Sequence, residues 1–153
     1  MKYSVYENGN TKIVKSENYN YIFNKDNGYF ARWGKTREDN PVMAPGPEIA
    51  DIEISAGKCS GNCRHCYKSN SSDAKNVYMS FDKFKILFDK IKNPCLTQIA
   101  FGITDLDSNP DLWKIMEYSR NNGVIPNITI NGKNVTDEQI NYLVNICGAV
   151  SVS

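Results

Sequence analysis

From residue 49 to the last residue, the sequence alternates between short β-type runs and amphipathic helical runs. Strands that alternate with helices favour parallel β-α-β units. We therefore expect an α/β fold with parallel strands, either a (β/α) barrel or an open doubly wound sheet. The expected strands cover residues 49–54, 97–101, 125–130 and 149–152, and the expected helices cover residues 81–92, 109–122 and 136–146.

The first two expected helices carry clear terminal signals. Ser80 is a plausible N-cap for the first helix, which Pro94 ends. Asn109 is expected to cap the second helix, with Pro110 at the first helical position, where its missing N–H costs nothing. Gly123 is expected to stop this second helix, because glycine readily adopts the left-handed conformation that ends helices.

The first 40 residues have a different pattern of short β-type runs and turn signals. Asn8-Gly9 predicts a two-residue hairpin turn, and residues 24–28 predict a longer hairpin loop. Residues 1–40 are therefore expected to form a small antiparallel β meander, which has too little core to be stable alone. A Pro/Gly linker at residues 41–48 separates it from the alternating part at 49–153. We expect the meander to be a flap over the barrel, with peptide binding by strand addition as the other possibility.

The last residues, 149–153, resemble the middle of a buried strand, without a following helix. An uncovered edge strand exposes unpaired backbone N–H and C=O groups that can pair with another chain. We therefore expect a core truncated in its fourth strand, about the first half of a barrel. The missing half is expected to come from the rest of a longer protein or from another chain.

Composition excludes several classes of protein. The net charge is +1, so no bulk attraction to nucleic acid is expected. The apolar runs are too short to span a bilayer, and no secretory signal opens the chain. Free cysteines without a secretory signal indicate a reducing, cytoplasmic environment.

The strongest chemical signal is the spacing C-x₃-C-x₂-C, formed by Cys59, Cys63 and Cys66 directly after the first expected strand of the alternating part. Three thiolates in one short loop can bind three corners of an iron–sulfur cubane. Electron-transfer clusters are normally closed by four cysteines. A three-cysteine loop therefore indicates a cluster with one open iron, where a substrate or cofactor can bind.

Structural zinc is the main alternative for this loop. Zinc prefers four Cys or His ligands in a tetrahedron. His65 directly precedes Cys66 and is expected to point away from a shared metal, so Cys95 or Cys147 would have to complete the site. Both are more typical of core cysteines, which pack as small hydrophobic residues. A disulfide is a weaker alternative, because the loop has an odd number of cysteines.

The loop resembles that of the radical S-adenosylmethionine (SAM) superfamily, whose members carry C-x₃-C-x₂-C after the first strand of a partial (β/α)₆ barrel. The resemblance implies that Cys59, Cys63 and Cys66 bind a [4Fe–4S] cluster. It also implies that SAM chelates the open iron and is cleaved to a 5′-deoxyadenosyl radical, so that the cofactor does the difficult chemistry. His65 stands where the family usually has an aromatic residue that lies against the adenine.

Two further segments are similar to family motifs. Residues 101–112 match in length the segment that ends in Gly-Glu-Pro, and Asp105 falls where the glutamate stands. The resemblance implies that the carbonyls of Gly102 and Thr104, with Asp105, receive the ammonium group of SAM. Residues 129–132 resemble the Thr-Asn-Gly at the end of the third strand, which implies that Asn131 lines the site. The alternative for Asp105 and Asn131 is an ordinary turn.

The resemblance implies a radical SAM enzyme or the N-terminal half of one, supplied with electrons by a reductant such as flavodoxin or ferredoxin. The sequence does not identify the catalytic residues or the substrate, although the meander favours a peptide or protein. The alternatives are a non-catalytic zinc- or cluster-binding interaction module and an inactive remnant.

Overall fold

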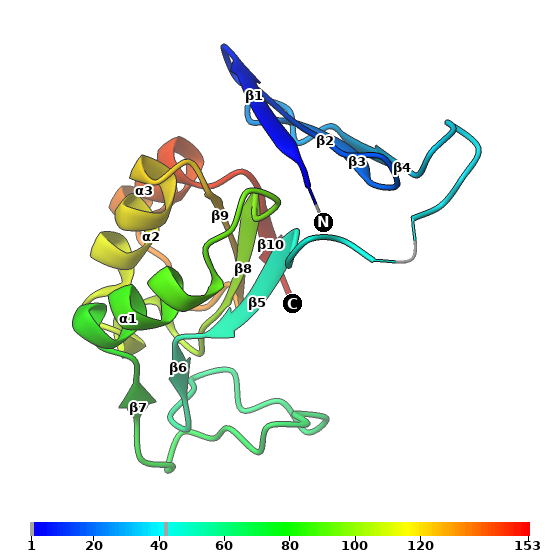
Figure 1. Ribbon diagram of the computed structural model, residues 1–153. Coiled ribbons are helices and arrows are strands. Elements are labelled where there is room, and N and C mark those ends of the chain that lie inside the picture. Colours follow the sequence, from blue (N-terminus) through cyan, green and yellow to red (C-terminus); the bar gives the residue numbers. More distant parts are fainter. Residues whose placement is uncertain (1, 42) are drawn as a thin grey trace.

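The computed structural model describes residues 2–41 and 43–153, so Met1 of the expected meander and Val42 of the expected linker lie outside the described residues. The chain forms a four-stranded antiparallel sheet, a four-stranded parallel sheet and a two-stranded antiparallel pair (Figure 1). The expected α/β class with parallel strands after an antiparallel meander is confirmed.

The N-terminal sheet has the order β1-β2-β3-β4 and only antiparallel pairs. Its turn register differs from the sequence prediction by one residue. Asn8 pairs with Thr11, so the two loop residues are Gly9 and Asn10, and Gly9 has a φ of 56°. Glycine takes this left-handed conformation without a steric penalty. The strands are β1 (Ser4–Asn8), β2 (Thr11–Lys15), β3 (Asn20–Asn24) and β4 (Phe30–Trp33).

The second sheet is entirely parallel, with the order β10-β9-β8-β5. All its carboxyl ends therefore meet at one edge, where the loops that follow the strands come together. Two short strands, β6 (Ser55–Ala56) and β7 (Val77–Tyr78), pair with each other beyond β5. The parallel strands are β5 (Ile49–Glu53), β8 (Gln98–Gly102), β9 (Ile125–Ile130) and β10 (Val150–Val152).

Three helices lie on one side of the parallel sheet (Figure 1): α1 (Phe81–Ile91), α2 (Leu112–Asn121) and α3 (Asp137–Ile146). The main core fills the space between them and the sheet, and includes Phe84, Phe88, Phe101, Ile115 and Ile128. The opposite face carries the apolar residues Ile49, Ala100 and Ile125 together with polar residues that are partly or fully exposed: Asp51, Glu53, Gln98, Asn127 and Thr129.

Ser80 caps α1 as the sequence predicts, but α2 begins at Leu112, two residues after the expected first helical position at Pro110. The Ser80 side chain accepts the Lys83 N–H, and Thr136 forms a reciprocal capping box with Gln139. Asn109 does not cap α2, which begins only at Leu112. Its buried amide instead donates to the carbonyls of Ile54 and Met79. A tertiary role for the side chain has replaced the expected local one.

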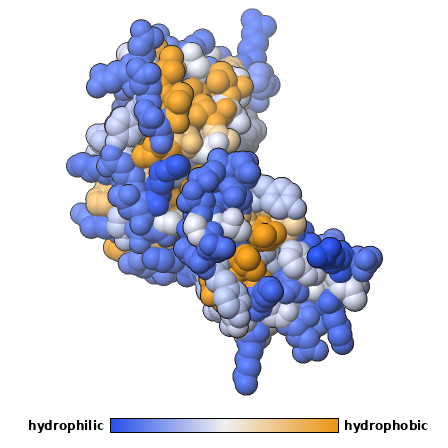
Figure 2. All heavy atoms as spheres, turned by 90° about the horizontal axis from the view of Figure 1, so that it is seen from above, coloured by the Kyte–Doolittle hydropathy of each residue, from blue (hydrophilic) through white to orange (hydrophobic). Residues whose placement is uncertain are grey.

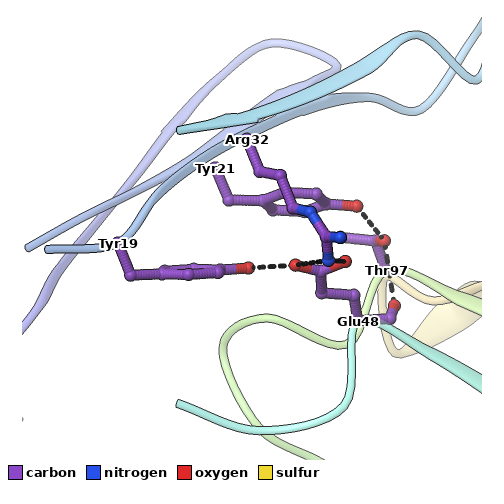
Figure 3. Close-up of polar contacts among 5 residues, drawn as sticks. All are labelled: Tyr19, Tyr21, Arg32, Glu48 and Thr97. Atoms are coloured by element: carbon purple, nitrogen blue, oxygen red, sulfur yellow. Dashed lines mark hydrogen bonds and ion pairs between the residues drawn. The ribbon is translucent and has the colours of Figure 1, made fainter. Parts of the chain in front are cut away.

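The meander packs against the amino-terminal ends of β8 and β9. Its buried aromatic residues contact Cys95 and Ile125 in a second, smaller core. Above this core, Tyr21 Oη lies 2.9 Å from Thr97 Oγ1, and both Tyr19 and Arg32 reach Glu48 (Figure 3). In Figure 1 the meander and the loop between β6 and β7 lie at opposite ends of the molecule. The meander is therefore not a cover for the carboxyl ends of the parallel strands.

No helix among residues 2–41 and 43–153 is long and apolar enough to cross a membrane. Viewed from the side that carries the meander, the surface is mostly hydrophilic, with separate apolar patches (Figure 2). The exposed apolar side chains of the meander are Tyr3, Val5, Tyr6, Tyr29 and Phe30.

Candidate functional site

The three clustered cysteines lie in the long loop that joins β6 to β7, at the carboxyl end of β5. Backbone contacts close this loop on itself. The Cys59 N–H donates to the Ser71 carbonyl, and the Ser71 N–H donates to the Gly57 carbonyl, both at 3.0 Å. The Asn70 side chain also accepts the Gly57 N–H at 2.8 Å. We call residues 57–71 the cysteine loop. Hydrogen bonds between its two ends hold it in a defined conformation.

All five cysteines of the chain are free thiols, and those of the cysteine loop are the more accessible group. Cys63 is exposed, and Cys59 and Cys66 are partly exposed. A Cβ atom added to Gly61 would lie 3.2 Å from Cys59 Sγ and 3.6 Å from Cys63 Sγ. Glycine at this position therefore leaves open a space between the sulfur atoms of Cys59 and Cys63. Thiols are the donors that iron–sulfur clusters use, so the residue types of this loop suit such a cluster.

Within the described residues, no three His, Cys, Asp or Glu side chains are grouped closely enough to hold a single metal ion. The ligand set of the cysteine loop therefore stays a prediction.

Asp105, three residues after the end of the neighbouring strand β8, binds the cysteine loop through both carboxylate oxygens. Its Oδ2 accepts the Ser60 N–H at 2.8 Å, and its Oδ1 accepts the Ser60 hydroxyl at 2.6 Å. Burial raises the pKa of the Asp105 carboxyl, but hydrogen bonds from Ser60 and Asn131 and the nearby charge of Lys58 outweigh it and hold the pKa below its ordinary value. Asp105 is therefore held as a carboxylate.

Asn131 follows β9 directly and brings a third strand end to the same point. Its Nδ2 lies 2.7 Å from Asp105 Oδ1, 3.1 Å from the Thr104 carbonyl and 3.6 Å from Cys59 Sγ. The Gly61 N–H is a second donor to Cys59 Sγ, at 3.4 Å. The sulfur of Cys59 thus faces two N–H groups.

A buried group of hydroxyls supports the turn that carries Asp105. Ser55 Oγ lies 2.5 Å from Ser108 Oγ and 3.2 Å from Thr104 Oγ1, and it also accepts the Thr104 N–H at 3.1 Å. All three residues are buried. The side chain of Thr104 therefore packs into this interior group, and only its carbonyl faces Asn131.

The structure brings together Thr104, Asp105 and Asn131, three of the residues that the resemblance assigns to SAM. Their acceptors already have protein donors, as does the Gly102 carbonyl, which accepts the Ile54 N–H at 2.9 Å. His65, the remaining predicted residue, is exposed on the cysteine loop. A ligand ammonium at this point would share these acceptors or displace their donors.

A cavity of about 340 Å³ opens beside Asp105. Lys58 and Lys133 bring positive charge to its walls, and Lys133 Nζ also lies 3.4 Å from the Ser60 carbonyl. Among the described residues, Asn76 Oδ1 is a buried acceptor without a hydrogen-bond partner, and Asn76 lines the same cavity.

Sequence reasoning did not identify Ser60, Asn76, Lys58 and Lys133 as parts of the site. For Ser60 and Lys58, their position beside Cys59 was the available signal. Asn76 and Lys133 carry no comparable sequence signal.

Cys95 and Cys147 lie outside the cysteine loop. Cys95 is fully buried under the meander, and Cys147 is partly buried against the main core. Burial raises the pKa of the Cys95 thiol, and it raises the pKa of Cys147 to about 12. Both therefore resemble packing residues, in agreement with the sequence expectation.

Comparisons with protein-family models, with curated proteins and with solved structures found no match for this chain.

Proposed function

We propose that this chain is a radical SAM enzyme, or the N-terminal half of one, that binds a [4Fe–4S] cluster through Cys59, Cys63 and Cys66. The observation that carries the proposal is the convergence of three strand ends on the cysteine loop. Asp105 after β8 and Asn131 after β9 both bind the part of the loop that holds Cys59. Functional residues of parallel α/β folds gather at this carboxyl edge.

The form of the parallel sheet supports a partial barrel as the finer fold. Parallel sheets are normally covered on both faces. Here the helices cover one face, and the other face carries polar residues such as Asp51, Gln98 and Asn127, which suit the wall of a solvated barrel interior. The remaining strands would come from a further part of the protein or from another chain.

In this proposal the chain's own residues hold and orient the cofactors. The three thiolates would ligate three irons of the cluster. Asp105 and Asn131 hold the loop, and the carbonyls of Gly102 and Thr104 lie at the same strand edge. When bound, the cluster would supply the electron that cleaves SAM into methionine and a 5′-deoxyadenosyl radical, after reduction by a flavodoxin or ferredoxin. This chemistry needs a reducing compartment, as in the cytoplasm.

Anaerobic reconstitution with iron and sulfide, followed by electron paramagnetic resonance (EPR) of the reduced protein with and without SAM, tests the proposal. We expect about four irons per chain and a cubane signal that changes when SAM is added. Replacing Cys59, Cys63 or Cys66 by Ala should abolish the cluster. The matched controls Cys95→Ala and Cys147→Ala should retain it, because these residues lie outside the cysteine loop.

Each other result of this experiment identifies a different kind of protein. A cubane signal that ignores SAM would indicate an inactive remnant or a cluster-binding interaction module. One equivalent of tightly bound zinc and no cluster would contradict the proposal and favour a zinc-binding module.

A further inference from the structure

We propose that Asp105 and Asn131 are positioning residues that hold Cys59 and raise the reduction potential of the cluster that it ligates. The inference rests on the proposed function, and it differs from the SAM-binding role that the resemblance implies for the same two residues. It has two steps, a mechanical one at Ser60 and an electrostatic one at the Cys59 sulfur.

The mechanical step is the grip of Asp105 on Ser60. One carboxylate oxygen takes the backbone N–H of Ser60, and the other takes its hydroxyl. This pair of contacts fixes the residue next to Cys59 both by its backbone and by its side chain. Hydrogen bonds to a charged acceptor are the stronger kind, so the carboxylate suits this task better than a neutral amide.

The orientation of the Asn131 amide follows from its neighbours. The Lys133 N–H donates to Asn131 Oδ1 at 2.8 Å, so the oxygen is on the side of the following turn. The nitrogen then faces three acceptors: Asp105 Oδ1, the Thr104 carbonyl and Cys59 Sγ. The opposite orientation would place an oxygen against these acceptors, so the hydrogen-bond network allows one assignment. Asp105 therefore also orients Asn131 toward the sulfur.

The electrostatic step is the donation of N–H groups to a ligand sulfur. Asn131 Nδ2 and the Gly61 N–H approach Cys59 Sγ at 3.6 and 3.4 Å, within the range of hydrogen bonds to sulfur. Hydrogen bonds to cluster sulfurs stabilise negative charge, and reduction adds negative charge to the cluster. Donors at Cys59 therefore favour the reduced state, which is the state that must deliver an electron.

The arrangement joins three successive strand ends at one cysteine. The cysteine loop follows β5 and β6, Asp105 follows β8, and Asn131 follows β9. Outer residues that orient metal ligands commonly alter metal affinity and redox properties when they are replaced. Asp105 binds Ser60, the residue next to Cys59, and the Asn131 amide donates to the Cys59 sulfur. We infer that this sulfur is held more firmly than those of Cys63 and Cys66.

The experiment compares Asn131→Ala and Asp105→Asn with wild type and with the control Asp107→Asn. Asp107 is a neighbouring exposed carboxylate that accepts a hydrogen bond from Gln139 and not from the cysteine loop. Full-length proteins are reconstituted anaerobically, and iron content and midpoint potential are measured by EPR-monitored redox titration without SAM. We expect a more negative potential for Asn131→Ala, lower cluster occupancy for Asp105→Asn, and no change for the control.

Thiol alkylation of the metal-free chain tests the mechanical step independently of cluster assembly. The alkylation rate of Cys59 relative to Cys63 is followed by peptide mass spectrometry. Asp105→Asn should raise this ratio several-fold, because the backbone beside Cys59 is released, and Asp107→Asn should not change it.

The outcomes separate this inference from the proposed function. A wild-type cluster that responds to SAM, together with an unchanged potential in Asn131→Ala, overturns the electrostatic step and leaves the proposed function intact. An unchanged alkylation ratio in Asp105→Asn overturns the mechanical step. A wild-type chain that takes up no cluster overturns both the inference and the proposed function.

Discussion

The hydroxyl of Tyr19 donates a 2.7 Å hydrogen bond to Oε1 of Glu48, across 29 positions of the chain. Arg32 adds an ion pair of 3.2 Å to the same carboxylate, whose side chain is only 14% exposed. Glu48 directly precedes β5, so this contact fixes the meander to the start of the parallel sheet (Figure 3). The meander is thus part of the structural base of the fold.

The first prediction concerns this contact. Glu48→Ala leaves the Tyr19 hydroxyl and the Arg32 guanidinium without their acceptor, and we expect a loss of about 2–3 kcal/mol in the free energy of unfolding. Glu7→Ala is the control, because Glu7 pairs with Lys25 at the surface, where an ion pair contributes about 0–1 kcal/mol. Urea unfolding measures both. Equal losses in the two variants would contradict a docking role for Glu48.

The second prediction concerns thiol reactivity in the metal-free protein. The thiolate is the reactive form, so a buried thiol with a raised pKa reacts slowly. Cys95 is fully buried, and the pKa of Cys147 is raised to about 12. At pH 8 we therefore expect iodoacetamide to label the three cysteines of the cysteine loop within minutes, with exposed Cys63 first. Cys95 and Cys147 should be labelled only after unfolding. Labelling of either in the folded protein within minutes would contradict its burial and show local opening of the core around it.

The third prediction concerns the space beside Gly61. In Gly61→Ala the new Cβ would meet two sulfurs at 3.2 and 3.6 Å, so we expect cluster occupancy after reconstitution to fall several-fold. Asn62→Gly is the matched control in the same loop. Asn62 has a φ of 48°, which glycine adopts more easily than asparagine does, so this variant should load normally. Iron analysis compares the two, and normal loading of Gly61→Ala would show that the two sulfurs lie apart from the cluster position.

Sequence periodicity predicted the parallel α/β part well, because its elements bury one continuous apolar face. The apolar spacing of residues 81–92 became α1, with Phe84 and Phe88 fully buried. The expected strand at 125–130 was found at those residues. In both segments the residue types that favour the local element are also those that suit burial in the core, so the sequence signal is unambiguous.

Contacts between residues far apart in the sequence could not be predicted in this way. Ser60 and Asp105 are separated by 45 positions, and each alone resembles an ordinary polar loop residue. Tyr21 and Thr97, which are in hydrogen-bond contact, are 76 positions apart in the sequence. The sequence therefore did not predict which end of the parallel sheet the meander would cover. Asn109 was assigned to a helix cap because its local signal was strong, while its tertiary partners left no trace in the sequence.

The fourth prediction follows from the true position of Asn109. The Asn109 side chain is buried; its amide nitrogen donates to two carbonyls, and its Oδ1 accepts the Asp111 N–H. Asn109→Ala should therefore cost about 2–4 kcal/mol, since it removes three hydrogen bonds of a buried side chain. Thr136→Ala, which removes the capping box of α3, should cost about 1 kcal/mol. Equal costs in urea unfolding would mean that Asn109 acts as a simple cap after all.

The fifth prediction is the pH dependence of the Asp105 contacts. Although burial acts to raise the pKa of this carboxyl, the donors from Ser60 and Asn131 lower it overall in the folded state. The unfolded chain therefore binds the proton more tightly than the folded one. The stabilisation is fully present above the unfolded pKa of about 3.9, and it is lost as the pH falls through the lower folded value.

Urea unfolding of the metal-free wild type and of Asp105→Asn, from pH 7 downward, tests this sign. The wild type should be more stable by about 1–2 kcal/mol at pH 7, because the variant loses charge-assisted hydrogen bonds to Ser60. Since protonation of the wild-type carboxyl leaves two neutral side chains to compare, the difference should narrow below about pH 4. Asp107→Asn should show little difference at any pH, because Asp107 is exposed. If the difference in unfolding free energy between wild type and Asp105→Asn stays constant down to acidic pH, the contribution of Asp105 does not depend on its negative charge.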